Sequence, residues 1–188
     1  KSLYEAQLRI ISLYSGMGVD PTLTCTPYYL KNVREGTHLA WAESSAISYV
    51  NSLLGARTNR EGGPSALAAA LVGKTPRYGL HLDENRKGDY LVDVQAPLEC
   101  ASDYGALGVL VGRSAKMRVP VFSGLKACSR DWLKSLGAAM AASGAVALYH
   151  VMGVTPEWLL KSGSGGQLWR EGKPEETVKV DRRQIKDA

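Results

Sequence analysis

Polar side chains are densest between Trp41 and Glu61, where the sequence reads WAESSAISYVNSLLGARTNRE. Glu43, Ser44 and Ser45 stand at the point where a short strand is expected to turn into a helix. The first N–H groups of a helix have no partner within the helix and bind anions readily. We therefore treat these three residues as candidate active-site groups, with helix capping as the alternative explanation of their types.

Two arginines follow in the Gly-rich loop that comes after this helix. Arg57, Asn59, Arg60 and Glu61 lie close together in the sequence. A guanidinium group can clamp a carboxylate or a phosphate with two parallel hydrogen bonds. The loop is thus a candidate anion-binding site, with Glu61 beside it as a candidate for proton transfer. Surface salt bridges are the competing explanation.

The three cysteines, Cys25, Cys100 and Cys128, form no CxxC pair, and their wide spacing does not favour a disulfide framework. Cys25 lies in the sequence TCTPY, whose Thr and Pro residues favour a loop over a core strand. It is either an inert side chain or one ligand of a cluster that needs further thiolates. Cys128 precedes an expected helix, where a thiolate is favoured, but packing is the simpler explanation. Cys100 has no supporting context.

The three histidines, His38, His81 and His150, are far apart and form no i, i+4 pair of the kind that binds zinc. The phosphate-binding glycine loop, the zinc-protease motif and the nucleophile elbow are missing from the sequence as well. His150 lies in the apolar run AVALYHVMG, which is typical of a core histidine, with proton transfer as the alternative. A further polar cluster ends an expected strand, where sites gather in α/β folds: His81, Asp83, Glu84, Asn85 and Arg86.

The composition is close to that of an average globular domain. The 188 residues are 45% hydrophobic and 22% charged, which excludes disorder and a coiled coil. The net charge of +5 arises from mixed signs without a basic run, so it does not indicate nucleic-acid binding. Residues 136–154 contain no Asp, Glu, Lys or Arg and imitate a membrane span. Their Ala, Gly and Ser content predicts a buried helix end and a buried strand instead.

Strand-like and helical patterns alternate along the chain. Apolar strands expected at 89–96, 118–125 and 145–154 are each followed by a helix. Such continuous apolar runs are typical of a parallel sheet covered by helices, so the predicted fold class is α/β. Ser129, Thr155 and Asp181 are expected helix N-caps. The other expected elements are a strand at 37–42, helices at 43–54, 65–72, 102–112 and 131–142, a stretch at 78–85 that starts as a strand, and a flexible connection at 161–176.

Both ends of the chain read as helices. Residues 1–18 have apolar side chains at helical spacing, and a helix is expected to begin after Asp181, shortly before the last residue. The first residue is Lys1 rather than Met. We expect from this pattern that the sequence is a piece of a longer protein.

Several long motifs resemble the aconitase X family. The resemblance covers nearly the whole chain, and the motifs stand in the order that the family has. It implies an aconitase-like α/β fold with a mostly parallel sheet and flanking helices. It also implies that residues 1–188 are the central portion of the catalytic, large-subunit domain, incomplete at both ends. The motifs are TCTPY (24–28), HLAWAESSA (38–46), NSLLGARTNREGGPSALAAAL (51–71), GLHLDENR (79–86) and LGAAMAASGAVALYHVMGVTPE (136–157).

The family contains two dehydratase activities. One converts (R)-5-phosphomevalonate to trans-anhydromevalonate 5-phosphate in an archaeal-type mevalonate pathway, and the other, mostly bacterial, acts on cis-3-hydroxy-L-proline. The form GARTNREGGPSALAAAL is more similar to the archaeal large subunit, so the resemblance implies a hydro-lyase for phosphomevalonate, with hydroxyproline dehydratase as the alternative. It further implies a small subunit as partner, a small-molecule carboxylate substrate and a cytoplasmic location, with neither nucleic acid nor membrane. The alternative from another class is a non-catalytic binding module for acidic partners, whose binding would weaken steeply with salt.

The resemblance also implies an iron–sulfur centre that binds the substrate hydroxyl as a Lewis acid. A [4Fe-4S] cluster is the first expectation, and a [2Fe-2S] cluster or mononuclear iron is the alternative. Cys25 alone matches a family motif and is the implied metal ligand. The other ligands are expected outside these residues, so the chain by itself should be inactive. The resemblance supports catalytic roles for Glu43, Ser44, Ser45, Glu61 and His150, and binding of substrate anions by Arg57, Asn59 and Arg60.

Overall fold

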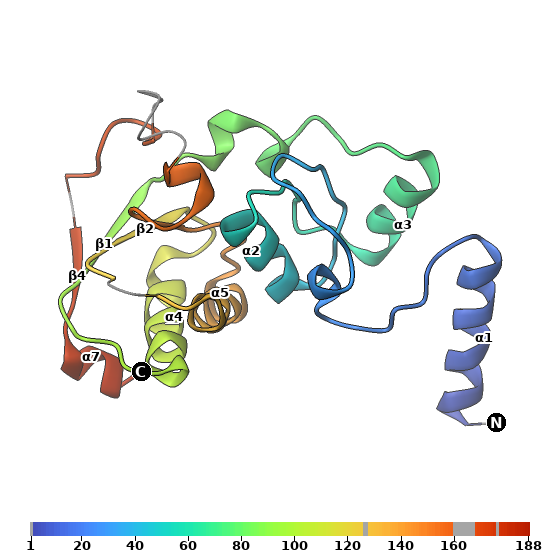
Figure 1. Cartoon of the computed structure of the whole chain (residues 1–188), viewed down its shortest axis with the longest axis horizontal. Coiled ribbons are helices and arrows are strands. Elements are labelled where there is room, and N and C mark those ends of the chain that lie inside the picture. The colour runs from blue at the N-terminus through green and yellow to red at the C-terminus, as the bar shows by residue number, and fades with distance from the viewer. Residues whose placement is uncertain (1, 126–127, 160–167, 176) are drawn as a thin grey trace. The chain divides into compact units, whose positions relative to one another are not determined.

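The computed structural model describes residues 2–125, 128–159, 168–175 and 177–188 (Figure 1). The chain divides into two compact units, Lys1–Asn32 and Val33–Ala188. The first unit contains α1 (Leu3–Gly16), in which the Ser2 hydroxyl accepts a hydrogen bond from the Glu5 N–H, and a 3-10 turn at Pro27–Tyr29. The helix expected at the start of the chain is confirmed.

The second unit is built on a four-stranded sheet. Its strands are β1 (Tyr90–Val94), β2 (Pro120–Ser123), β3 (His150–Val151) and β4 (Thr177–Val180), in the order β3-β2-β1-β4. Every neighbouring pair is parallel. Most residues of β1 and β2 are buried, as continuous apolar runs in a covered parallel sheet require. The predicted α/β class with a parallel sheet is therefore confirmed.

Two long helices connect neighbouring strands of the sheet and lie side by side in Figure 1. They are α4 (Ala101–Ala115), between β1 and β2, and α5 (Arg130–Gly144), between β2 and β3. The two backbones approach closely where both helices have glycine. A Cβ added to Gly144 would lie only 1.8 Å from the Gly112 carbonyl oxygen, so a larger residue does not fit there. The Ser129 hydroxyl accepts the Trp132 N–H and caps α5, as predicted.

Among the described residues, three shorter helices also belong to the second unit. α2 (Ser44–Leu53) packs against α5 and is almost wholly buried, which fits its predicted apolar face. α3 (Gly63–Val72) ends at Gly73, whose φ of +65° is the left-handed conformation that glycine adopts without strain. α7 (Arg182–Lys186) packs against α4 and has the predicted Asp181 cap, here a full capping box with Gln184.

Two predicted strand regions before β1 are wrong. Residues 37–42 form only an isolated bridge between His38 and Arg57, because no neighbouring strand extends the pairing. Residues 78–85, expected to start as a strand, form 3-10 turns at Gly79–His81 and Asp83–Arg86. The positive φ of Gly79 and the hydrogen bond from the Leu80 N–H to the Asn59 side chain fix the first turn.

Two further predictions near the end of the sheet need correction. The strand expected at 145–154 is reduced to β3, because the backbone before it bonds to side chains of α2: the Ala147 carbonyl accepts from Asn51, and the Tyr149 N–H donates to Ser52. β4 was not predicted at all. The flexible connection expected at 161–176 lies largely outside the described residues; in the described part, Trp169 forms a bridge with Gly88.

The uncharged stretch 136–154 comprises the end of α5, an irregular segment, β3 and a turn, so the helix end and strand predicted from its composition are both present. In the part of the chain that the structure describes, no helix is long and apolar enough to cross a membrane.

Candidate functional site

Three of the predicted site residues line a single cavity of about 460 Å³. They are Asn59, Arg60 and Glu61. Val119 and Leu148 form part of its wall and closely precede β2 and β3, so the cavity lies at the amino edge of the parallel sheet. We call it the amino-edge cavity. The Glu61 side chain is held by the Ser65 hydroxyl, which donates to Oε2 at 2.6 Å.

Two arginines that the sequence did not single out also line the amino-edge cavity. Arg118 lies over the Tyr90 ring, 4.0 Å from its centroid, and Arg170 forms an ion pair of 3.1 Å with Asp89. Tertiary structure alone brings them to Arg60, because they come from segments far apart in the sequence. The sequence held one clue to these arginines: Arg118 stands directly before the apolar run of β2. Arg170 had no comparable clue.

Arg57 and Asn59 are both tied to the 3-10 turn region. Arg57 donates to the His81 carbonyl at 3.0 Å and forms an ion pair with Asp83. The Asn59 amide accepts from the Leu80 N–H at 2.8 Å and donates to the Tyr78 carbonyl at 3.2 Å. These bonds shape the cavity wall. They also use hydrogen-bonding groups of Arg57 and Asn59 that were predicted to bind substrate anions.

Glu43, Ser44 and Ser45 form the start of α2, as predicted. Glu43 is the N-cap residue, and its Oε1 accepts from the Ser45 N–H at 3.2 Å and from the Ser45 hydroxyl at 3.1 Å. A side-chain carboxylate therefore occupies the position that the sequence offered to an external anion. Glu43 is exposed and both serines are half-buried.

A buried ion pair stands next to the amino-edge cavity. Arg86 is completely buried, and its guanidinium contacts the Glu157 carboxylate. It also donates to the Asn51 side chain at 3.2 Å, the Asn51 carbonyl at 3.0 Å and the Leu80 carbonyl at 3.0 Å. Burial lowers the pKa of Arg86, and the Glu157 carboxylate opposes that effect. The pair thus joins the 3-10 turns at 79–86, helix α2 and the residues after β3.

His150 belongs to this buried cluster and not to the amino-edge cavity lining. The ring is only 4% exposed, and its Nε2 lies 2.8 Å from the Arg86 carbonyl. Since a carbonyl oxygen only accepts, Nε2 carries the proton and donates. Glu157 Oε2 lies 3.9 Å from the same nitrogen. The environment is that of a hydrogen-bonded core histidine.

His81 pairs with His38, which the sequence places far away. Their Nδ1 atoms are 2.8 Å apart and the rings are stacked, with centroids 5.0 Å apart. One nitrogen must donate and the other accept, so only one of the two Nδ1 atoms carries a proton. Burial lowers the pKa of His81, and His38 lowers it further. Glu61 acts in the opposite direction, whereas Arg86 and Arg57 add to the lowering.

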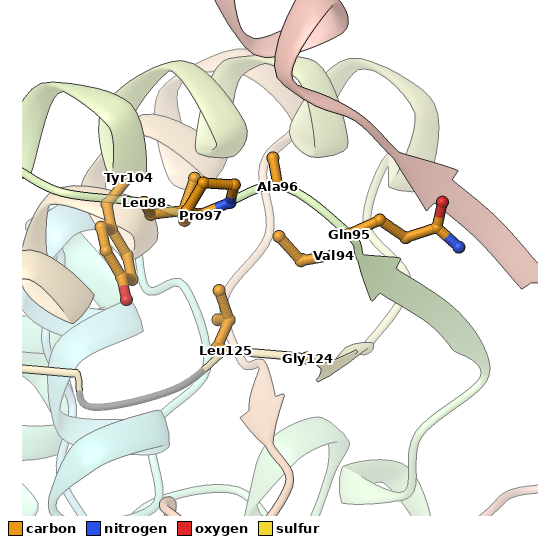
Figure 2. Close-up of a pocket in the computed structure, with 8 residues that line it drawn as sticks. All are labelled: Val94, Gln95, Ala96, Pro97, Leu98, Tyr104, Gly124 and Leu125. Atoms are coloured by element: carbon orange, nitrogen blue, oxygen red, sulfur yellow. The ribbon is translucent and has the colours of Figure 1, made fainter.

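A second cavity, of about 400 Å³, lies at the opposite edge of the sheet, after β1 and β2. Figure 2 shows the side chains of Val94, Ala96 and Leu125 around the space, with Gln95 pointing away from them. The Tyr104 hydroxyl donates to Cys128 Sγ at 3.4 Å. The wall of this second cavity is mainly apolar and contains none of the site residues predicted from the sequence.

Cys25 lies in the first unit, in an exposed loop. The Thr24 hydroxyl accepts the Thr26 N–H at 3.0 Å, which supports the loop predicted around TCTPY. Within the described ranges, no group of three or more His, Cys, Asp or Glu side chains could hold a metal ion. Cys25 offers a single exposed thiol, and the resemblance implied that the other ligands of a cluster lie outside these residues. The described residues by themselves therefore do not fit an iron–sulfur cluster.

The fold defined above, a parallel sheet with flanking helices, is that of an aconitase-like α/β protein. The crystal structure of Thermococcus kodakaraensis aconitase X, described as its holo-form, matches 98% of this chain with a TM-score of 0.88 and 50% identity. The family model for the aconitase X first domain matches residues 1–84, and the model for the second domain matches residues 88–188. The chain belongs to the aconitase X family.

Curated relatives carry two names. The phosphomevalonate dehydratase large subunit of Thermococcus kodakarensis is 57% identical over 155 residues, which is 82% of this chain and 40% of that protein. The Methanosarcina mazei large subunit is 53% identical over 183 residues, covering 96% of this chain and 44% of the relative. The cis-3-hydroxy-L-proline dehydratase of Pseudomonas aeruginosa is 38% identical, covering all of this chain and 32% of the relative. The chain thus spans less than half the length of these relatives.

Proposed function

We propose that the protein carrying this chain is the large subunit of a hydro-lyase that dehydrates (R)-5-phosphomevalonate to trans-anhydromevalonate 5-phosphate. The observation that carries the proposal is the pattern of identities. Four relatives named phosphomevalonate dehydratase large subunit are 53–61% identical and a fifth is 38% identical, whereas two hydroxyproline dehydratases are 38% and 40% identical. A small subunit is the proposed partner, and the cytoplasm of an archaeal-type mevalonate pathway is the proposed location.

The reaction removes a proton from the carbon next to the substrate carboxylate and expels the hydroxyl group. We assign proton removal to Glu61, because its carboxylate lines the amino-edge cavity beside Arg60 and is oriented by Ser65. Arg60 binds a substrate anion there. Arg57 and Asn59 position that wall through their bonds to the 3-10 turn.

The remaining candidates receive supporting roles. Glu43, Ser44 and Ser45 order the start of α2, and Asn51 on that helix bonds to Thr58 in the arginine loop. His150 acts through the buried ion pair and not by direct proton transfer. Family membership favours a metal or iron–sulfur cofactor, to which Cys25 would give one ligand, with the others supplied from outside these residues.

An activity assay on the complete enzyme tests this proposal. The full-length large subunit is combined with its small subunit, reconstituted anaerobically with iron and sulfide, and given each substrate separately. We expect trans-anhydromevalonate 5-phosphate, identified by mass spectrometry and NMR, from phosphomevalonate. Turnover of cis-3-hydroxy-L-proline in the same preparation, with phosphomevalonate left intact, would instead establish the alternative activity.

A further inference from the structure

The amino-edge cavity gathers three guanidinium groups against one carboxylate. Arg60, Arg118 and Arg170 line it, and Glu61 is the acidic side chain on its wall. All three arginines are exposed enough for a ligand to reach them from solvent. Even with the Asp89 carboxylate that pairs with Arg170, the arginines outnumber the acidic groups around the cavity, which favours an anionic ligand.

Arg118 is fixed in place by the protein. Its side chain lies over the Tyr90 ring, while Nε donates to the Ala115 carbonyl at 3.0 Å and Nη2 donates to the Ser114 carbonyl at 3.0 Å. These contacts leave Nη1 for a ligand. Since the side chain is already ordered, binding an anion costs little additional conformational entropy.

Arg170 is held by a carboxylate that has a second task. Asp89 Oδ2 pairs with Arg170 at 3.1 Å, and Asp89 Oδ1 accepts the Val119 N–H at 2.8 Å, just before β2. The Arg170 N–H also donates to the Gly88 carbonyl at 3.0 Å. Asp89 thus anchors Arg170 to the same strand end that carries Arg118. The pair with Asp89 offsets part of the charge of Arg170 but leaves its other N–H groups available.

The rest of the cavity wall suits a short carbon chain. Met117, Val119 and Leu148 provide apolar surface next to the arginines. A ligand with a doubly charged end and an apolar body would match both parts of this lining. A phosphomonoester of a small branched acid has that chemistry, whereas the imino acid cis-3-hydroxy-L-proline has no phosphate.

We propose that the amino-edge cavity binds the phosphate group of the substrate, and that Arg118 and Arg170 determine specificity for a phosphorylated substrate over an unphosphorylated one. The inference rests on the proposed function for the identity of the phosphomonoester. According to this inference, two arginines outside the GARTNRE motif discriminate between the substrates of the two activities of the family. Arg60 completes the site from the motif itself.

Two measurements on the complete large subunit with its small subunit test the proposal. The first is the Kd of inorganic phosphate from calorimetric titration, and the second is the KM and kcat for 5-phosphomevalonate. We expect Arg118→Gln and Arg170→Gln each to raise the Kd and KM by about 10-fold or more, the usual effect of losing a charged hydrogen bond. The value of kcat should change less than KM. Arg113→Gln, an exposed site on α4 outside the lining, is the matched control and should change neither constant.

The outcomes separate the site from the reaction. If both variants fold normally and keep the Kd and KM within about two-fold of the unchanged protein, well below the loss expected of a charged contact, the proposed site is wrong. If phosphate binds through these arginines but phosphomevalonate is not dehydrated, the proposed function fails and the site stands. Should Arg118→Gln not fold, Arg118→Lys keeps the stem over Tyr90 and removes the planar fork, and with Arg170→Gln it decides the question.

Discussion

The buried ion pair between Arg86 and Glu157 gives the sharpest stability prediction. Arg86 is completely buried and Glu157 is 8% exposed, so neither charge is solvated by water. Glu157→Gln keeps the size of the side chain and an oxygen that accepts from Arg86 Nε, but it removes the negative charge. A buried guanidinium is then left without its counterion, although three other acceptors remain.

The magnitude follows from the charges and the remaining hydrogen bonds. Two opposite charges about 4 Å apart attract by about 4 kcal/mol at an effective dielectric constant of about 20. Removing one partner of a buried pair costs about 3–5 kcal/mol. Because glutamine keeps one acceptor and is itself easier to bury than a carboxylate, we expect a loss near the lower limit, about 3 kcal/mol. For a chain of this length that corresponds to a Tm lower by roughly 6–12 °C.

Urea unfolding at pH 7 measures this loss, with Asp187→Asn as control. Asp187 pairs with Arg183 on the surface, where both side chains are largely exposed, and no measurable shift is expected. In the double variant Arg86→Met with Glu157→Gln, the two losses should not add, since the charge that needs a partner is gone. A loss below about 1 kcal/mol for Glu157→Gln, within the range of an ordinary surface substitution, would refute the reasoning.

Three further predictions concern His81, the helix interface and Cys25. Burial and His38 lower the pKa of His81 from its usual 6.5, so the unfolded chain binds a proton that the folded protein resists. The contribution of His81 to the free energy of unfolding is therefore fully present above pH 6.5 and declines as the pH falls towards the lowered pKa. In urea titrations, His81→Asn should reduce the dependence of the unfolding free energy on pH in this range. An unchanged pH dependence would contradict the prediction. Gly144→Ala places a Cβ 1.8 Å from the Gly112 carbonyl oxygen and should destabilise the protein by about 1–3 kcal/mol, whereas Gly105→Ala on α4, with nothing within 4 Å, should not. Cys25→Ser should lower the iron content and turnover of the reconstituted enzyme while Cys100→Ser leaves both intact, and equal iron content in the two variants would exclude Cys25 as a ligand.

Local patterns predicted the parts of the fold that depend on local energetics. The apolar runs of β1 and β2 and the caps Ser129 and Asp181 were identified because burial and capping act within a few residues. β4 was missed because its short TVKV sequence becomes a strand only by pairing with β1, far away in the chain. The length of β3 was overestimated because α2 side chains take the backbone bonds that a longer strand would use.

The candidate site shows the same division. Residue types in the loop predicted an arginine-rich anion site, and Arg60 and Glu61 do line one cavity. Arg118 and Arg170 could not be placed there from the sequence, since the ion pair of Arg170 with Asp89 arises only from the folded chain. The close pairing of His38 with His81 is likewise a tertiary contact that sequence spacing does not reveal.

The most direct test of the central claim is the ratio of kcat/KM for the two substrates in one preparation of the complete two-subunit enzyme. The account predicts a kcat/KM for (R)-5-phosphomevalonate that exceeds the value for cis-3-hydroxy-L-proline by orders of magnitude. It also predicts that Arg170→Gln lowers the ratio of the two kcat/KM values, because the variant raises the KM for the phosphorylated substrate. A preference for hydroxyproline, or no turnover of phosphomevalonate by an enzyme loaded with iron, would contradict it.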